Sequence, residues 1–184
     1  MGLDQYLTRK TYVKNWSHMT PEEKINIELS GETKNIDVKK ISNIEEEVGY
    51  WRKANQIHRW FIDNCTDDGR DECQVIYVSH EKLKELYDTC VKIKEETEME
   101  TTGEMHDVHV IKDGEMKKEQ FLTSKPKSTE MMEELLPTQQ GFFFGSTDYD
   151  QYYMEDIEGT IEILKPIIDG SETEEGDYYY RASW

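Results

Sequence analysis

The feature that most limits the fold is the order of the short alternating segments, which come in pairs around glycine turns instead of alternating with helices. Residues 25–29 and 36–38 lie on either side of Ser30-Gly31-Glu32, a pattern that predicts a hairpin. Leu3 to Val13 and Tyr178 to Trp184 are predicted as further strands. We therefore expect an α+β fold in a single domain over residues 1–184, with helices packed on one face of an antiparallel sheet.

A long helix is predicted from Ser42 to about Asn64. Ser42 is a suitable N-cap, and Glu45, Glu46 and Glu47 would occupy the first turns, where the helix dipole favours acids.

Other elements follow from shorter signals. Ser79 is the expected N-cap of a second helix, whose apolar residues recur at helical spacing. Ser146 or Thr147 is the expected N-cap of a last helix that ends near Ile168. The remaining predicted elements are a turn at Pro21–Glu23, a strand at Gln74–Val78, a helix from Thr129 to Leu136 and a buried strand at Phe142–Phe144.

Residues 95–128 are the least core-like part of the chain. They contain two alternating runs around Asp113-Gly114, which predicts an exposed hairpin insertion. A flexible, disordered linker is the alternative.

The charge is distributed unevenly. The chain has 22 Lys and Arg against 40 Asp and Glu, a net charge of −18. Residues 1–61 are nearly neutral, so the acidic excess lies in the rest of the chain, and residues 148–177 alone hold eleven acids and one lysine. This distribution excludes a generally basic nucleic-acid binder. It is typical of a solubilising surface, or of an acidic surface that imitates DNA to occupy a host protein.

The segment 48–61 contains the first candidate site. If it is helical, Trp51, Asn55 and His58 share one side, and Arg52 and Arg59 lie on an adjacent polar stripe. Guanidinium groups bind phosphates, an amide can contact a base or ribose, and an indole ring can stack. Alternatively the aromatic rings belong to the core, the arginines extend to solvent, and His58 is a structural hydrogen-bonding residue.

The second candidate is the loop before the last helix. Phe143, Gly145 and Ser146 lie in a glycine-bounded run whose backbone N–H groups could hold an anion. Asp148 and Asp150 weaken this interpretation, because carboxylates in the first turn already satisfy the helix N-terminus.

Catalytic and metal chemistry have little support in the sequence. His58 is a candidate general base, but no nucleophile or carboxylate pair accompanies it, so no catalytic residue is assigned. We expect no metal site and no cofactor. Cys65, Cys73 and Cys90 are odd in number and irregularly spaced, which is typical of reduced thiols.

Three segments resemble a family of small proteins encoded by bacteriophages and prophages. They are Met1-Gly2-Leu3-Asp4-Gln5-Tyr6-Leu7, residues 48–58 and residues 135–146. Members of that family commonly open Met-Gly-Leu-Asp-Met-Tyr-Leu, from which this chain departs at Gln5. The resemblance implies a phage setting, in which a small protein counters host defence or adjusts host metabolism, and it implies no particular reaction.

These observations lead to three expectations about function. The first is a binder that sequesters a small anionic, nucleotide-like ligand, such as a host defence signal, at the residues named above. The second is an acidic interaction protein or DNA mimic that acts through residues 148–177, and the third is a small nucleotide-processing enzyme. We expect the host cytoplasm as the compartment, no direct nucleic-acid binding and no membrane segment, and we leave a homo-oligomer open.

Overall fold

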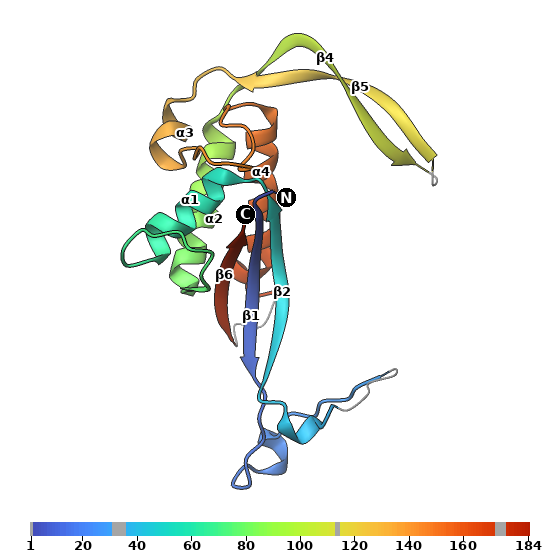
Figure 1. Ribbon diagram of the computed structural model, residues 1–184, viewed down its shortest axis with the longest axis vertical. Helices are drawn as coiled ribbons and strands as arrows, with labels where there is room; N and C mark the ends of the chain where they lie inside the picture. Colours follow the sequence, from blue (N-terminus) through green and yellow to red (C-terminus); the bar gives the residue numbers. More distant parts are fainter. Residues whose placement is uncertain (1, 31–35, 113–114, 172–175) are drawn as a thin grey trace.

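The computed structural model describes residues 2–30, 36–112, 115–171 and 176–184, and it has the expected α+β fold (Figure 1). In chain order, the elements are β1 (Asp4–Tyr12), two single 3-10 turns (Pro21–Glu23 and Val38–Lys40), β2 (Asn43–Arg52), α1 (Asn55–Cys65), β3 (Ile76–Val78), α2 (His80–Glu96), β4 (Met99–Lys112), β5 (Glu115–Pro126), α3 (Glu130–Leu135), α4 (Gln151–Ile168) and β6 (Asp177–Ser183).

The main sheet has the strand order β2-β1-β6-β3, and every neighbouring pair is antiparallel. Helices α1, α2 and α4 lie on one face of this sheet, while the described residues place no helix on the other face (Figure 1). The core lies between the two layers. Leu7, Trp51 and Tyr180 enter it from the strands, and Phe61, Leu86 and Ile157 are among the helical residues that meet them.

The helix expected from Ser42 is wrong over its first half, because residues 43–52 form β2. The segment pairs with β1, and its side chains alternate, with Gly49 and Trp51 inward and Tyr50 and Arg52 outward. A β-bulge determines which side chains of β2 point inward. Leu7 pairs with Gly49 and Thr8 pairs with Glu47, so β2 carries one extra residue. Pairing with a distant strand has overridden the local helical signals of the glutamates.

The hairpin expected at residues 25–38 is also wrong. Residues 24–30 and 36–37 have no regular structure, and Val38 begins a 3-10 turn, while Gly31 and Glu32 of the predicted turn lie outside the described residues. Ile25 and Ile36 are 42% and 55% exposed, so such a hairpin would have no apolar face to bury. In the described part of the connection between β1 and β2, the Asn15 side chain accepts a hydrogen bond from the N–H of Ile25 and donates one to its C=O.

The N-cap of α4 is Asp150, not the expected Ser146 or Thr147. Asp150 accepts hydrogen bonds from the N–H groups of Tyr152 and Tyr153, so the helix begins at Gln151. The predicted buried strand at Phe142–Phe144 is a turn in which Phe142 is 82% exposed. Only Phe144 of this run reaches the core.

The remaining predicted elements are confirmed, including α2 with Ser79 as its N-cap, the short α3, and the strands β3 and β6. Within the described residues, 99–126 form the expected hairpin of β4 and β5, and its Asp113-Gly114 turn lies outside them. This hairpin and the excursion after β1 project as two arms toward the side of β2 (Figure 1).

Gly49 is required where β2 crosses the helix layer. A Cβ at this position would come within 2.7 Å of Ile163 Cγ2 and 3.3 Å of Leu7 Cβ. We expect Gly49→Ala to lower the free energy of unfolding by about 1–3 kcal/mol, because the core would be overpacked. Gly159→Ala is the matched control: its Cβ would meet nothing within 4 Å, and alanine in helix α4 should raise stability by about 0.5–1 kcal/mol. Urea denaturation measures both, and equal effects would contradict the close packing at Gly49.

Candidate ligand-binding site

A cavity of about 340 Å³ opens where the end of β2 and the start of α1 meet the loop before α4. Three predicted site residues line it, namely Arg52, Gly145 and Ser146, together with Lys53 and Gln56. The rest of the wall consists of Thr138, Asp148, Asp150, Tyr152, Tyr153, Glu155 and Asp156. The cavity therefore brings together the two candidate segments, residues 48–61 and the loop before the last helix.

Unusual backbone conformations hold the rim of this cavity. Lys53 has a φ of 63° at the junction between β2 and α1, and its N–H donates to Leu3 O at 2.8 Å. Gly145, with a φ of 94°, packs so closely that an added Cβ would lie 3.1 Å from Lys53 Cβ. Phe143 has a φ of 73° in the same loop. Left-handed non-glycine residues are strained, and they concentrate at binding and active sites.

Asn55 fastens the loop to helix α1 and is not available to a ligand. Its Nδ2 group donates to Ser146 O at 2.7 Å and to Phe144 O at 3.2 Å, and its Oδ1 accepts from Gln139 N at 2.8 Å. The side chain is 1% exposed. The predicted ligand contact is thus corrected to a structural role that shapes the cavity from below.

The wall formed by α4 and the loop before it is acidic. Ser146 Oγ donates to Asp148, Asp150 caps α4, and Gln56 Nε2 donates to Asp156 Oδ2 at 2.9 Å. Burial raises the pKa of Asp156 to about 6, although the hydrogen bond from Gln56 opposes this shift. Asp156 therefore changes its charge close to physiological pH.

The positive side of the cavity is formed by Arg52 and Lys53. The Arg52 side chain is 64% exposed, and its Nε lies 3.8 Å from Asp4 Oδ1, too far for a hydrogen bond. Two cations and four carboxyl groups, those of Asp148, Asp150, Glu155 and Asp156, thus line the same cavity. Such a cavity suits a ligand with one anionic end and several hydrogen-bond donors at the other.

The other predicted contacts lie elsewhere. Trp51 is buried in the core, where its Nε1 donates to Thr160 Oγ1 at 2.9 Å. Arg59 bonds Asp63 and the carbonyl of Thr138, so it supports the cavity from outside. The Phe143 ring packs against Phe142 and is not part of the wall.

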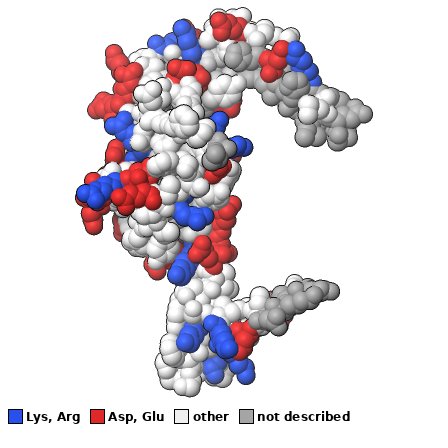
Figure 2. Space-filling model, viewed as in Figure 1, with Lys and Arg blue, Asp and Glu red and all other residues white. Residues whose placement is uncertain are grey.

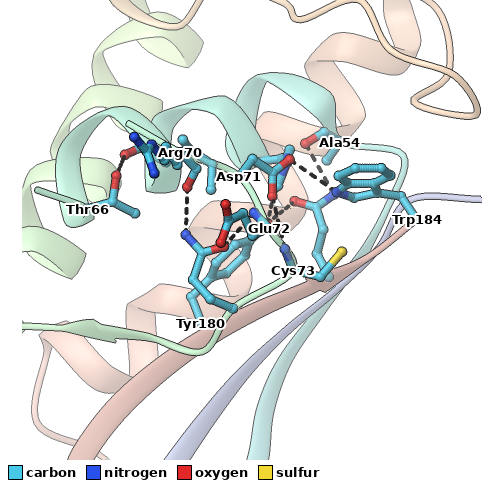
Figure 3. A network of polar contacts seen from close by, with 12 residues as sticks. Ala54, Thr66, Arg70, Asp71, Glu72, Cys73, Tyr180 and Trp184 are labelled. Carbon is cyan, nitrogen blue, oxygen red and sulfur yellow. Dashed lines mark hydrogen bonds and ion pairs between the residues drawn. The ribbon is translucent and has the colours of Figure 1, made fainter. Parts of the chain in front are cut away.

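His58 is fully buried on the opposite side of α1, in a polar network that joins β1, β6 and the segment after α1. Its Nδ1 lies 2.8 Å from Tyr180 Oη, and its Nε2 lies 2.8 Å from Asp71 Oδ2. Asp71 also accepts from Trp184 Nε1, and Figure 3 shows these two residues beside Cys73 and Tyr180. The His58 ring meets the edge of Phe144, which ties the network to the site loop.

Four side chains are connected in this network. Gln5 Nε2 donates to Ala54 O, and Gln5 Oε1 accepts from the Tyr180 hydroxyl. The two nitrogens of the His58 ring are within hydrogen-bond distance of Tyr180 Oη and of the Asp71 carboxylate. Burial raises the pKa of Tyr180 well above its ordinary value, which keeps its proton in place. With both nitrogens occupied, the His58 ring stabilises the fold and does not face a ligand.

Sequence reasoning missed Lys53, Asp156 and the partners of His58. Lys53 is next to the predicted Arg52, and only its left-handed backbone distinguishes it. Asp156 lies 100 residues from Gln56, and Tyr180 lies 122 residues from His58. No spacing rule links residues so far apart.

Removing the Tyr180 hydroxyl should weaken the fold. Tyr180→Phe leaves Gln5 Oε1 and His58 Nδ1 without their partner in a buried place, so we expect a loss of about 1–3 kcal/mol in the free energy of unfolding. Tyr179→Phe, on the uncovered face of the same strand, should change it by less than about 0.5 kcal/mol. Chemical denaturation compares the two, and equal values would rule out a stabilising network.

Asp156 makes a separate prediction about pH. Its pKa is raised from 3.8 to about 6 in the folded protein, so ionisation costs stability as pH rises through this window. Asp156→Asn keeps an acceptor for Gln56 without a charge, and should raise the free energy of unfolding by about 1–3 kcal/mol at about pH 7 and by little at about pH 4. Glu162→Gln, at an exposed position of α4, is the control. A gain that does not depend on pH would contradict the assignment.

The described residues give no metal site, and two of the three thiols are buried enough to shift their pKa. No group of three or more His, Cys, Asp or Glu residues there could hold a metal ion. Burial raises the pKa of Cys65 to about 11 and that of Cys90 to about 12, so both remain thiols at neutral pH. Within the same residues, no helix combines the length and the apolar character needed to cross a membrane.

Comparisons with protein-family models, curated proteins and solved structures find no match to this chain. The functional argument therefore depends on the cavity itself.

Proposed function

We propose that the protein binds and sequesters a small nucleotide-like ligand in the cavity between Arg52 and Asp156. The observation that carries this proposal is the charge of the lining: two cations, Arg52 and Lys53, and four carboxyl groups line one cavity of about 340 Å³. A phosphate can bind Arg52 and Lys53, because charge-assisted hydrogen bonds are the strong ones. The amino and imino groups of a base can donate to the acidic wall.

Tyr152 supports a planar ligand. Its side chain lines the cavity and is 50% exposed, so one side of the ring is available for stacking. Together, a cationic end, a hydrogen-bonding wall and an aromatic ring match the phosphate, the base edge and the base plane.

The carboxyl groups also limit the charge of the ligand. A triphosphate would bring three or more negative charges close to four acidic side chains, and only two cations offset them. The proposal therefore favours ligands with one phosphate or with phosphates in diester linkage over nucleoside triphosphates.

Isothermal titration calorimetry with a panel of nucleoside monophosphates, cyclic nucleotides and triphosphates tests this function. Arg52→Ala should weaken binding of the best ligand by about 10- to 100-fold, the equivalent of one charge-assisted hydrogen bond. Arg70→Ala should bind as the wild type does, because Arg70 is an exposed loop residue near Asp68 and does not line the cavity. Absence of heat with every ligand, or equal losses in the two variants, would refute the proposal.

A phage setting, with the ligand as a host defence signal, stays a prediction from the family resemblance. The DNA-mimic alternative gains no support from the described acids: Asp150 caps α4, Asp156 is partly buried, and Glu158 pairs with Lys94 at 3.0 Å. The enzyme alternative loses its proposed base, because His58 is buried with both nitrogens occupied.

A further inference from the structure

The sheet face without helices carries a pattern of aromatic and charged side chains, of which only Arg52 also lines the ligand cavity. Side chains of β1, β2 and β6 form an open groove of about 640 Å³ on this face. In Figure 2, this side of the molecule carries charged groups of both signs with uncharged surface between them. The groove is therefore neither a uniformly acidic surface nor a purely apolar one.

Aromatic residues occupy the middle of the face. Tyr6 is the cross-strand neighbour of both Tyr50 and Arg181. The Tyr6 and Tyr50 rings lie 5.4 Å apart, and the Arg181 guanidinium lies 5.4 Å from the centre of the Tyr6 ring. Tyr77 and Tyr179 pack edge to face in the next row of the sheet. Tyrosine and arginine are enriched at the centres of protein interfaces.

Charges occupy the two ends of the face, with opposite order on neighbouring strands. At one end, Arg52 of β2 pairs across the strands with Asp4 of β1. At the other end, two rows beyond Tyr6, Glu45 of β2 pairs with Lys10 of β1. Strands β1 and β2 thus each carry one sign of charge at one end of the face and the opposite sign at the other end.

We propose that this face binds a second copy of the chain, related by a two-fold axis that runs across the strands between the Tyr6 and Thr8 rows. Such an axis reverses the order of the rows and keeps each strand over its own copy. It places Lys10 opposite Asp4 of the second copy and Arg52 opposite Glu45 of the second copy. Every such contact occurs twice, as in any isologous interface, and no like charges meet. The tyrosine rows of the two sheets meet at the centre.

Charge balance favours a second copy over a nucleic acid. The charged residues in the four rows, from Asp4 to Lys10 of β1 and across β2 and β6, are three basic and four acidic, while the whole chain has a net charge of −18. Single-stranded nucleic acids bind grooves with a clear positive excess. Two acidic molecules, in contrast, approach each other best through a nearly neutral and self-complementary face.

The expected association is reversible. With strands about 4.8 Å apart and rows about 6.8 Å apart, four strands and four rows span at most roughly 500 Å² in projection. Stable complexes bury about 800 Å² of accessible surface on each partner, so a dimer of modest affinity is expected.

Analytical ultracentrifugation of the full chain over a wide concentration series tests the proposal. The wild type should pass from monomer to dimer, whereas Lys10→Glu and Asp4→Lys should each remain monomeric, because each variant makes two like-charge contacts across the axis. An equimolar mixture of the two variants should form a heterodimer, because both contacts then join opposite charges. Circular dichroism checks that each variant is folded, and Lys84→Glu, on helix α2, should dimerise as the wild type does.

Several outcomes would overturn the inference. A wild type that is monomeric at every concentration removes the dimer, and a dimer that survives Lys10→Glu assigns it to another surface. Failure of the mixed variants to associate contradicts the two-fold axis. Binding of a single-stranded oligonucleotide that Lys10→Glu abolishes would assign the face to nucleic acid instead.

Discussion

The pairing of β2 with β1 determines how the rest of the structure is arranged. The bulge between Glu47 and Gly49 sets the phase of β2, so Trp51 enters the core and Arg52 points outward. A slip of one residue would exchange these two side chains. The same strand ends at Lys53, whose left-handed backbone directs the chain into α1 and brings Asn55 under the site loop. The cavity therefore depends on the register of two strands that are distant in sequence.

Local signals predicted the elements that local interactions stabilise. Ser79 caps α2 through its own side chain, and residues 99–126 pair with each other as their alternation indicates. Prediction failed between Ser42 and Arg52, because the partner of this segment is β1, which lies far away in sequence. A spacing of three or four residues among Trp51, Asn55 and His58 fits one helix, but the chain places a strand end and a helix start within that span.

The site residues divide in the same way. Arg52, Gly145 and Ser146 are exposed residues in turns or at strand ends, and the structure brings them to one cavity. Asn55 and His58 have side chains suited to binding, but both form their hydrogen bonds with other groups of the protein. The residue types alone indicated which polar side chains lie among aromatic residues in the sequence. It could not separate a group that binds a ligand from one that holds the protein together, because burial is a property of the whole fold.

The position of β2 at the border of the sheet also affects the solubility of the protein. This strand leaves one side of its backbone unpaired in the main sheet, and such edges can recruit strands from other molecules. Three consecutive glutamates, Glu45, Glu46 and Glu47, lie along it, so two such edges repel each other. The arms project on the same side and restrict the approach of a foreign strand (Figure 1). The glutamates of β2, which do not line the ligand cavity, thus protect the molecule against aggregation through the longest open edge of the main sheet.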